Sequence, residues 1–256
     1  MRPGALAPIL ALGWLAAAAN PAPASENASL PCVAHSHEGR AYTVCAAHAG
    51  QDDIRLWHTA PDGMVYGSFD RIEATLAESD ESLAFAMNAG MYHPDRAPVG
   101  LYVEDGVEAM RLITARGPGN FGMLPNGVFC VAPSGFAVIE SRSFAETAPA
   151  CDHATQSGPM LVIDGELHPR FIADSTSRLM RNGVGVSADG RTAYFAITEQ
   201  GVNFHEFAQF FREALDTPNA LYFDGNVSRL HAPALGRSDG GRQMGPVVGL
   251  VQPAAR

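Results

Sequence analysis

Short apolar runs separated by tight turns follow one another through most of this chain, and they limit the folds that it can adopt. Six Asp-Gly pairs occur, at positions 62, 105, 164, 189, 224 and 239, and Asp-Gly is a strong signal for the turn of a β-hairpin. The spacing of turns and runs predicts five hairpins, in which 53–58 pairs with 64–69, 99–104 with 107–113, 127–131 with 136–140, 159–163 with 166–171, and 183–187 with 192–198.

Two segments have the period of a helix. In residues 70–82, Ile72 and Leu76 lie on one face, and Asp70 and Glu73 resemble a capping pair. Residues 203–216 carry an apolar stripe of phenylalanines, with Asn203 placed to cap the helix. We therefore predict an α+β protein, a single domain of mostly antiparallel or mixed β-sheet with a few helices.

The first residues resemble a secretory signal. Arg2 precedes an apolar run that ends at Ala19, and residues 22–24 have the small-x-small form of a cleavage site. An uncleaved membrane anchor is the alternative, but the run is short for a membrane span and Pro8 interrupts it. We expect a signal peptide at 1–24, a mature domain at 25–256, a periplasmic or secreted location, and no membrane partner after cleavage.

The four cysteines fit an oxidising compartment. Four cysteines allow three pairings, and we expect the two local ones, Cys32–Cys45 and Cys130–Cys151. No C-x-x-C pair occurs, so the spacing is not that of a zinc site.

Charge and composition exclude several functions. The net charge is −10, and an acidic chain repels polyphosphates at long range, which argues against a nucleic-acid partner. All 17 basic residues are arginine. Without lysine, Schiff-base chemistry, Ser-Lys hydrolysis and a Walker-A phosphate loop are excluded.

Familiar catalytic motifs are incomplete. Gln209 stands where a zinc-protease helix needs its second histidine, and Ser157 does not lie in a G-x-S-x-G elbow. His35 and His37 could touch a metal, but an exposed pair of this kind is more often solvated. We predict neither a metal site nor a cofactor.

The fifth Asp-Gly pair differs from the others. The apolar run 220–223 ends at Asp224, and the residues that follow do not alternate as a returning strand would. Polar residues and glycines interrupt other strand ends as well, at Asn88, Gly90, Asn126, Gln156, Ser157, Gly158, Arg178, Arg181 and Asn182. Singly, each is typical of a turn. Together at one sheet edge they would suit a phosphate beside a sugar, because arginine binds phosphate with a fork of donors and amides read hydroxyls.

Four of these stretches occur in the order found in a known family. They are MNAGMY (87–92), QSGPMLVIDGEL (156–167), RNGVGVSADG (181–190) and LYFDGNVS (221–228). From about residue 83 to Val251 the chain resembles the phosphodiester glycosidase family, the catalytic domain of the mannose 6-phosphate uncovering enzyme and of many secreted bacterial proteins. The family's D-G-G-G-S signature falls on 224–228, where Asp224, Gly225 and Ser228 match, while Asn226 and Val227 replace two glycines.

The resemblance implies hydrolysis of a sugar-1-phosphodiester, which releases the sugar and a phosphomonoester. We hypothesise that Asp224 is the nucleophile or general base and that Glu199, after the run 192–198, is the second acid. The expected phosphate contacts are Arg178, Arg181, Ser157 and the N–H of Gly158. Asn88, Gln156 and Asn182 would contact sugar hydroxyls or orient the acids. The other expected substrate-binding residues are Gly90, Asn126, Gly225, Asn226 and Ser228.

Two functions from other classes remain open. A periplasmic binding module would hold a glycan or phosphoglycan with the same residues but would tolerate the loss of Asp224. A structural partner in the cell envelope would act through an apolar surface patch. For Asp224 itself, the alternative role is that of a turn acid whose carboxylate accepts backbone N–H groups.

Overall fold

The computed structural model describes Met1 and residues 30–254. Most of the predicted signal peptide therefore lies outside the described residues. No helix in the described part of the chain is both long enough and apolar enough to cross a membrane.

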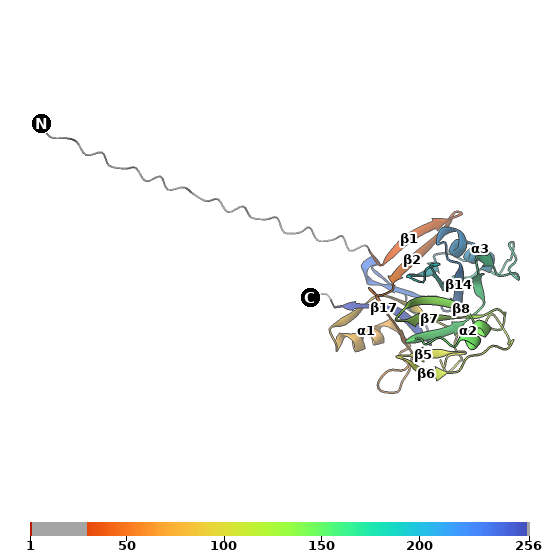
Figure 1. The fold of residues 1–256 in the computed structure, drawn as a ribbon, viewed down its shortest axis with the longest axis horizontal. Helices are drawn as coiled ribbons and strands as arrows, with labels where there is room; N and C mark the ends of the chain where they lie inside the picture. The colour runs from red at the N-terminus through yellow and green to blue at the C-terminus, as the bar shows by residue number, and fades with distance from the viewer. Residues whose placement is uncertain (2–29, 255–256) are drawn as a thin grey trace.

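Three sheets build the domain (Figure 1), and every pairing between their strands is antiparallel. The seven-stranded sheet has the order β1 (Cys32–His37), β2 (Arg40–His48), β13 (Thr192–Thr198), β12 (Asn182–Val186), β14 (Asn219–Asp224), β10 (Met160–Ile163) and β11 (Glu166–Leu167). The β4 sheet has the order β16 (Arg237–Ser238), β15 (Leu230–Ala232), β4 (Glu81–Asn88), β17 (Val247–Pro253) and β3 (Asp53–Trp57). The β7 sheet has the order β6 (Val107–Met110), β5 (Tyr102–Glu104), β9 (His153–Ser157), β7 (Gly127–Ala132) and β8 (Gly135–Glu140).

Short helices cover parts of these sheets. They are α1 (Phe69–Ala77), α2 (Ser141–Thr147) and α3 (Phe204–Gln209), which continues into the π-helical turn η1 (Phe210–Ala214), together with the 3₁₀ turn η2 (Pro233–Leu235). Helix α3 lies against β14 of the seven-stranded sheet, and α1 lies beside β17 (Figure 1). The predicted α+β class is confirmed.

One core joins the three sheets. Phe85 of β4, Phe129 of β7 and Phe195 of β13 are fully buried, and the Phe195 ring lies 5.3 Å from Phe85 and 5.5 Å from Phe129, measured between ring centroids. Burying an aromatic side chain of this size stabilises the fold by about 2–3 kcal/mol. Each sheet therefore contributes one aromatic ring to a shared contact that fixes the sheets against one another.

Four of the five predicted hairpins are confirmed. They are β5–β6, β7–β8, β10–β11 and β12–β13. The hairpin of 53–58 with 64–69 is wrong, because β3 pairs with β17 and touches the second segment only through the isolated bridge Thr59–Val65. Pairing with β17 buries Ile54 and Leu56 against the core, an area that the local partner does not offer.

The expected caps are half right. Asn203 and Glu206 form a capping box at the start of α3, as predicted. At α1 the cap is Ser68, whose hydroxyl accepts the N–H of Arg71, so the Asp70–Glu73 pair is wrong. Glu73 instead accepts the backbone N–H of Leu83.

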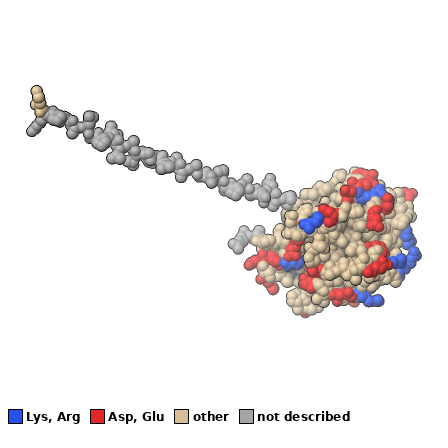
Figure 2. Space-filling model, viewed as in Figure 1, with Lys and Arg blue, Asp and Glu red and all other residues tan. Residues whose placement is uncertain are grey.

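Both predicted disulfides are confirmed. Cys32–Cys45 joins register partners of β1 and β2, whose Cα atoms lie 3.9 Å apart. Cys130–Cys151 joins β7 to the residues before β9, with Cα atoms 5.6 Å apart. Figure 2 shows one face of the molecule, where acidic side chains are more prominent than basic ones, in keeping with the net charge of −10.

Glu206 carries the most extensive ion-pair network near α3. Its carboxylate accepts hydrogen bonds from Arg40 Nη2 at 2.8 Å, Arg178 Nη2 at 2.6 Å and the N–H of Asn203 at 3.0 Å. Burial raises the pKa of Glu206, but the hydrogen bonds from Arg178, Asn203 and Arg40 outweigh burial and hold the pKa below its ordinary value.

We expect Glu206→Gln to lower the free energy of unfolding by about 2 kcal/mol at neutral pH, because two guanidinium groups lose their shared counter-ion. The folded-state pKa is depressed, so this stabilisation is present above the unfolded pKa and is lost as pH falls through the folded pKa. Urea unfolding at pH 7 and at about pH 3.5 checks both points. Glu213→Gln, which removes an exposed partner of Arg212, is the control and should change little. An equal deficit at both pH values would contradict the linkage.

Candidate active site

Asp224 is the last residue of β14. Its carboxylate stabilises the turn by which the chain leaves the sheet. Its Oδ1 accepts the backbone N–H groups of Gly225 at 2.5 Å and Asn226 at 2.7 Å. No group of the described residues donates a hydrogen bond to Oδ2. The chain does not return as a hairpin but crosses to β15 in the β4 sheet. The turn therefore uses one carboxylate oxygen and leaves the other available.

A cleft of about 700 Å³ opens beside this carboxylate. Its lining residues come from the four segments 91–99, 118–121, 224–227 and 242–243, not all of whose residues reach it. Asp224 is the single carboxylate in the lining. The other polar side chains of the lining are Tyr92, His93, Arg96, Asn120, Asn226, Arg242 and Gln243, and its larger apolar side chains are Met91, Val99, Phe121 and Val227.

Positive charge surrounds Tyr92 in this cleft. The Arg96 guanidinium carbon lies 5.4 Å from the centroid of the Tyr92 ring. Burial raises the pKa of Tyr92 and the charge of Asp224 raises it further, while Arg96, Arg229 and Arg242 act in the opposite direction. The phenol therefore stays protonated at neutral pH, and three guanidinium groups lie close enough to Tyr92 to favour an anionic ligand beside it.

Asn88 and Asn182 form a reciprocal pair of amides beneath the loop 224–228. Asn88 Nδ2 donates to Asn182 Oδ1 at 3.1 Å, and Asn182 Nδ2 donates to the carbonyl of Asn88 at 2.8 Å. Asn88 Oδ1 also accepts the N–H of Arg229 at 2.9 Å. Both residues are fully buried, so they hold the loop in place and do not line the cleft.

Ser228 closes the same loop from its far end. Its hydroxyl lies 3.0 Å from the carbonyl of Asp224, 2.9 Å from that of Met180 and 3.3 Å from Asn182 Oδ1. Gly225 is required at its position, because a Cβ there would lie 2.4 Å from the Tyr222 hydroxyl oxygen. The matching positions of the D-G-G-G-S signature therefore shape the turn around Asp224.

Ser157, Gly158 and Asn126 form a second buried support. The Ser157 hydroxyl donates to the carbonyl of Phe223 at 3.1 Å, next to Asp224. A Cβ on Gly158 would lie 2.6 Å from Asn126 Cβ, and Asn126 Nδ2 donates to the carbonyl of Phe121, which lines the cleft, at 3.0 Å. These residues position two walls of the cleft from behind.

Gln156 and Gly90 hold the loops on the other side. The Gln156 amide accepts the N–H groups of Leu101 and Ile113, each at 3.0 Å, and donates to Ser141 Oγ at 2.7 Å. A Cβ on Gly90 would lie 2.4 Å from the Gln156 carbonyl oxygen. Only glycine allows this approach, which leads the chain directly into the cleft residues Met91 and Tyr92.

Three further predicted side chains also lie outside the cleft lining. Arg178 forms an ion pair with Glu206. Glu199 accepts hydrogen bonds from Thr43 Oγ1 at 2.6 Å and Arg237 Nη1 at 2.5 Å. Arg181 is fully buried, with its guanidinium stacked on Phe204, so it does not reach a ligand in the cleft directly. Their proposed contacts with substrate stay predictions, and Asp224 and Asn226 are the predicted site residues that line the cleft.

Sequence reasoning missed most of the polar lining. Tyr92, His93 and Arg96 directly follow the Asn88–Gly90 motif, and their position after a strand end was the signal that could have found them. Asn120 lies between two glycines, as turn residues often do. Arg242 lies in a glycine-rich segment without any period, and no pattern marks it.

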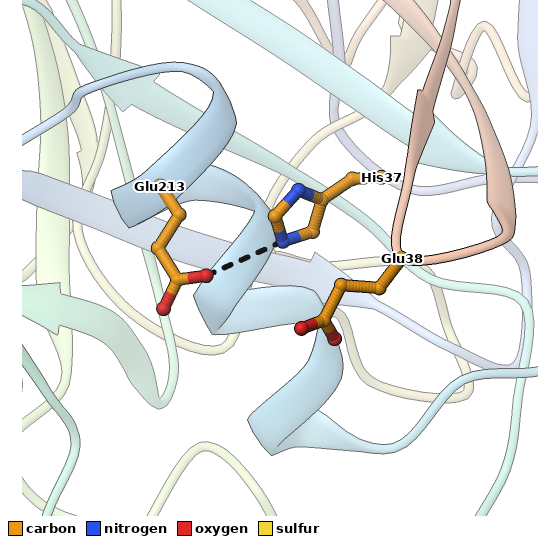
Figure 3. Close-up of side chains that lie close together, drawn as sticks. All are labelled: His37, Glu38 and Glu213. Atoms are coloured by element: carbon orange, nitrogen blue, oxygen red, sulfur yellow. Dashed lines mark ion pairs between the residues drawn. The ribbon is translucent and has the colours of Figure 1, made fainter.

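One group of side chains with metal-ligand character occurs among the described residues, away from this cleft. His37, Glu38 and Glu213 have donor atoms within 4.8 Å of one another (Figure 3). His37 Nε2 lies 3.5 Å from a Glu213 oxygen, and each carboxylate also pairs with an arginine, Glu38 with Arg40 and Glu213 with Arg212. The group is accounted for as an ion-pair cluster between β1 and η1.

Sequence comparisons identify one matching family model and one relative above 30% identity. A family model described as phosphodiester glycosidase matches residues 81–238. The YigE protein of Escherichia coli is 33% identical over 192 residues, which cover 75% of this chain and 73% of that protein.

Two solved structures share the fold. One is the catalytic domain of zebrafish N-acetylglucosamine-1-phosphodiester α-N-acetylglucosaminidase, auto-inhibited by its pro-peptide, with a TM-score of 0.59, 13% identity, and coverage of 88% of this chain and 82% of that one. The other is a Burkholderia pseudomallei protein described as exported, with a TM-score of 0.51, 13% identity, and coverage of 82% and 74%.

Proposed function

This chain belongs to the phosphodiester glycosidase family, and from that membership we propose that it hydrolyses a sugar-1-phosphodiester to the sugar and a phosphomonoester. The observation that carries the proposal is the composition of the cleft, where Asp224 is the single carboxylate among guanidinium, phenol and amide groups. An ordinary glycosidase uses two carboxyl groups, one of which protonates the leaving oxygen. A phosphomonoester leaves without that proton, so one acid is enough.

Asp224 acts through its available Oδ2 as the nucleophile or the general base. In the general-base form, Asp224 takes a proton from a water molecule whose oxygen attacks the anomeric carbon. The bond between that carbon and the phosphate oxygen breaks, and its electron pair stays on the phosphomonoester. Arg96 and Arg242 hold the phosphate, since they are the cationic side chains of the lining. Tyr92, Asn120 and Asn226 contact sugar hydroxyls.

The buried predicted residues act indirectly. Asn88, Asn182 and Ser228 fix the Asp224 loop, while Gly90, Asn126, Gln156, Ser157 and Gly158 fix the walls of the cleft. This division follows from burial, because side chains with no exposed surface orient the groups that touch the ligand.

We also propose a periplasmic or secreted location. Two disulfides support it, since such bonds persist in oxidising compartments. The structural likeness to a protein described as exported is consistent with it.

A panel of sugar-1-phosphodiesters with methyl, alkyl and aryl aglycones tests the reaction, with phosphomonoester release followed by phosphorus NMR. Matched aryl glycosides that lack the phosphate are the control, and we expect no cleavage of them because the cleft offers no second carboxyl group. If the protein binds these phosphodiesters but hydrolyses none of them, it is a binding module and the proposed reaction is wrong.

A further inference from the structure

Arg181 is the largest fully buried side chain of the described residues, and it carries a charge. Its Nε donates to the carbonyl of Val202 at 2.9 Å, and its Nη2 donates to the carbonyl of Ser177 at 3.0 Å. Its Nη1 is buried without a hydrogen-bond partner in the described structure. No carboxylate of residues 30–254 forms an ion pair with it.

A buried charge without a counter-ion is costly. Removing a guanidinium from water costs several kcal/mol unless a partner charge compensates. Two carbonyl oxygens and the Phe204 ring, whose centroid lies 3.8 Å from the guanidinium carbon, offset part of this cost. A neutral side chain of similar length could be buried here at a lower cost in free energy, yet the fold retains the charged arginine.

This charge lies directly behind the Asp224 loop. Arg181 precedes Asn182, the register partner of Asp224. Its guanidinium carbon lies 5.4 Å from the centroid of the Tyr222 ring. Tyr222 lies on β14 two residues before Asp224. The close approach of the Tyr222 hydroxyl to Gly225 then brings the guanidinium and the turn together.

The turn that the Tyr222 hydroxyl approaches carries Asp224 and Asn226, which line the cleft. Asn120 also lines the cleft. Burial raises the pKa of Tyr222, and the charge of Arg181 acts in the opposite direction. Tyr222 thus contacts both the buried guanidinium and the Gly225 turn at the edge of the cleft.

We propose that Arg181 is a positioning residue whose buried charge is compensated by the anionic phosphate group of a ligand bound beside Asp224 and Asn120. This inference rests on the proposed function, because it takes the phosphodiester as the ligand. Arg181 touches neither the ligand nor the reacting atoms. It supplies a fixed positive potential through Tyr222, from a position that is itself fully buried.

Arg181→Met and Arg181→Lys test the charge, with Arg191→Met as the matched control at the opposite end of β12 and β13. Calorimetric titration with inorganic phosphate measures affinity without relying on turnover. We expect Arg181→Met to weaken phosphate binding by on the order of tenfold, with a melting temperature equal to or above that of the wild type. Arg181→Lys keeps the charge and should stay within about threefold of the wild-type affinity. Arg191→Met should change neither quantity.

A structural role for Arg181 predicts the reverse pattern, in which Arg181→Met melts earlier but binds phosphate normally. Wild-type phosphate affinity in that variant overturns the inference and leaves the proposed function standing if the wild type turns over phosphodiesters. If Arg181→Met does not fold, a tenfold loss in folded Arg181→Lys overturns it instead. A wild type with neither phosphate binding nor turnover overturns both proposals.

Discussion

Replacing Asp224 with asparagine should lower kcat/KM by about a thousandfold or more, the scale expected when a reacting carboxylate is removed, with almost no change in the melting temperature. The separation of the two effects follows from the geometry of the turn. Oδ1 accepts the N–H groups of Gly225 and Asn226, and the amide oxygen of asparagine accepts the same two bonds. Only the negative charge and the second carboxylate oxygen are lost, and these are the groups that we assign to the chemistry.

Asp164→Asn is the matched control for this experiment. Asp164 also precedes a glycine in a turn, between β10 and β11, but it is exposed and does not line the cleft. We expect neither activity nor melting temperature to change in it. Steady-state kinetics and thermal unfolding of both variants decide the matter. If Asp224→Asn unfolds the protein, or folds and keeps full activity, then Asp224 is a turn residue and the assignment is wrong.

Asn182→Ala should show the opposite combination, a large loss of stability together with a smaller loss of activity. The substitution removes both hydrogen bonds with Asn88 and the contact with Ser228. Buried polar groups left without partners cost about 1–3 kcal/mol each, so we expect a loss of about 3 kcal/mol in the free energy of unfolding. Activity should fall by on the order of tenfold, because the Asp224 loop loses its anchor.

The double variant Asn88→Ala with Asn182→Ala checks the origin of that loss. Two residues that satisfy one another should cost less together than the sum of the single variants, since the second substitution removes a group that the first has already left unpaired. Urea unfolding of the four proteins measures this coupling. Strictly additive losses would show that the two amides act independently and that the hydrogen bonds between them contribute little to stability.

The local part of the fold could be predicted from the sequence, namely hairpins between consecutive strands, whereas eight of the fourteen strand pairings join strands that are not consecutive along the chain. Asp-Gly turns mark β5–β6, β10–β11 and β12–β13, and a Pro-Ser-Gly turn marks β7–β8, so these hairpins could be placed within a few residues. The predicted hairpin of 53–58 with 64–69 is wrong for a physical reason. The partner of β3 is β17, near the opposite end of the sequence, and local turn chemistry cannot report a pairing of that separation.

The candidate site could be predicted only in part. Asp224 could be found, because the pattern after it breaks where a hairpin should continue. The sequence could not show which arginines line the cleft and which are structural, because their contact partners come from distant parts of the chain. Glu206 of α3 pairs with Arg178, and Phe204 covers Arg181, whereas Arg96 and Arg242 reach the cleft from irregular loops.

The chain that follows Asp224 leaves the seven-stranded sheet and enters the β4 sheet at β15. The acid therefore lies at a junction whose two halves are held by different sheets, with Asn182 on one side and Asn88 on the other. A peptide that carries residues 221–230 alone would lack both supports. The candidate catalytic loop thus depends on both sheets, and transplanting it into another scaffold would require both sheet edges.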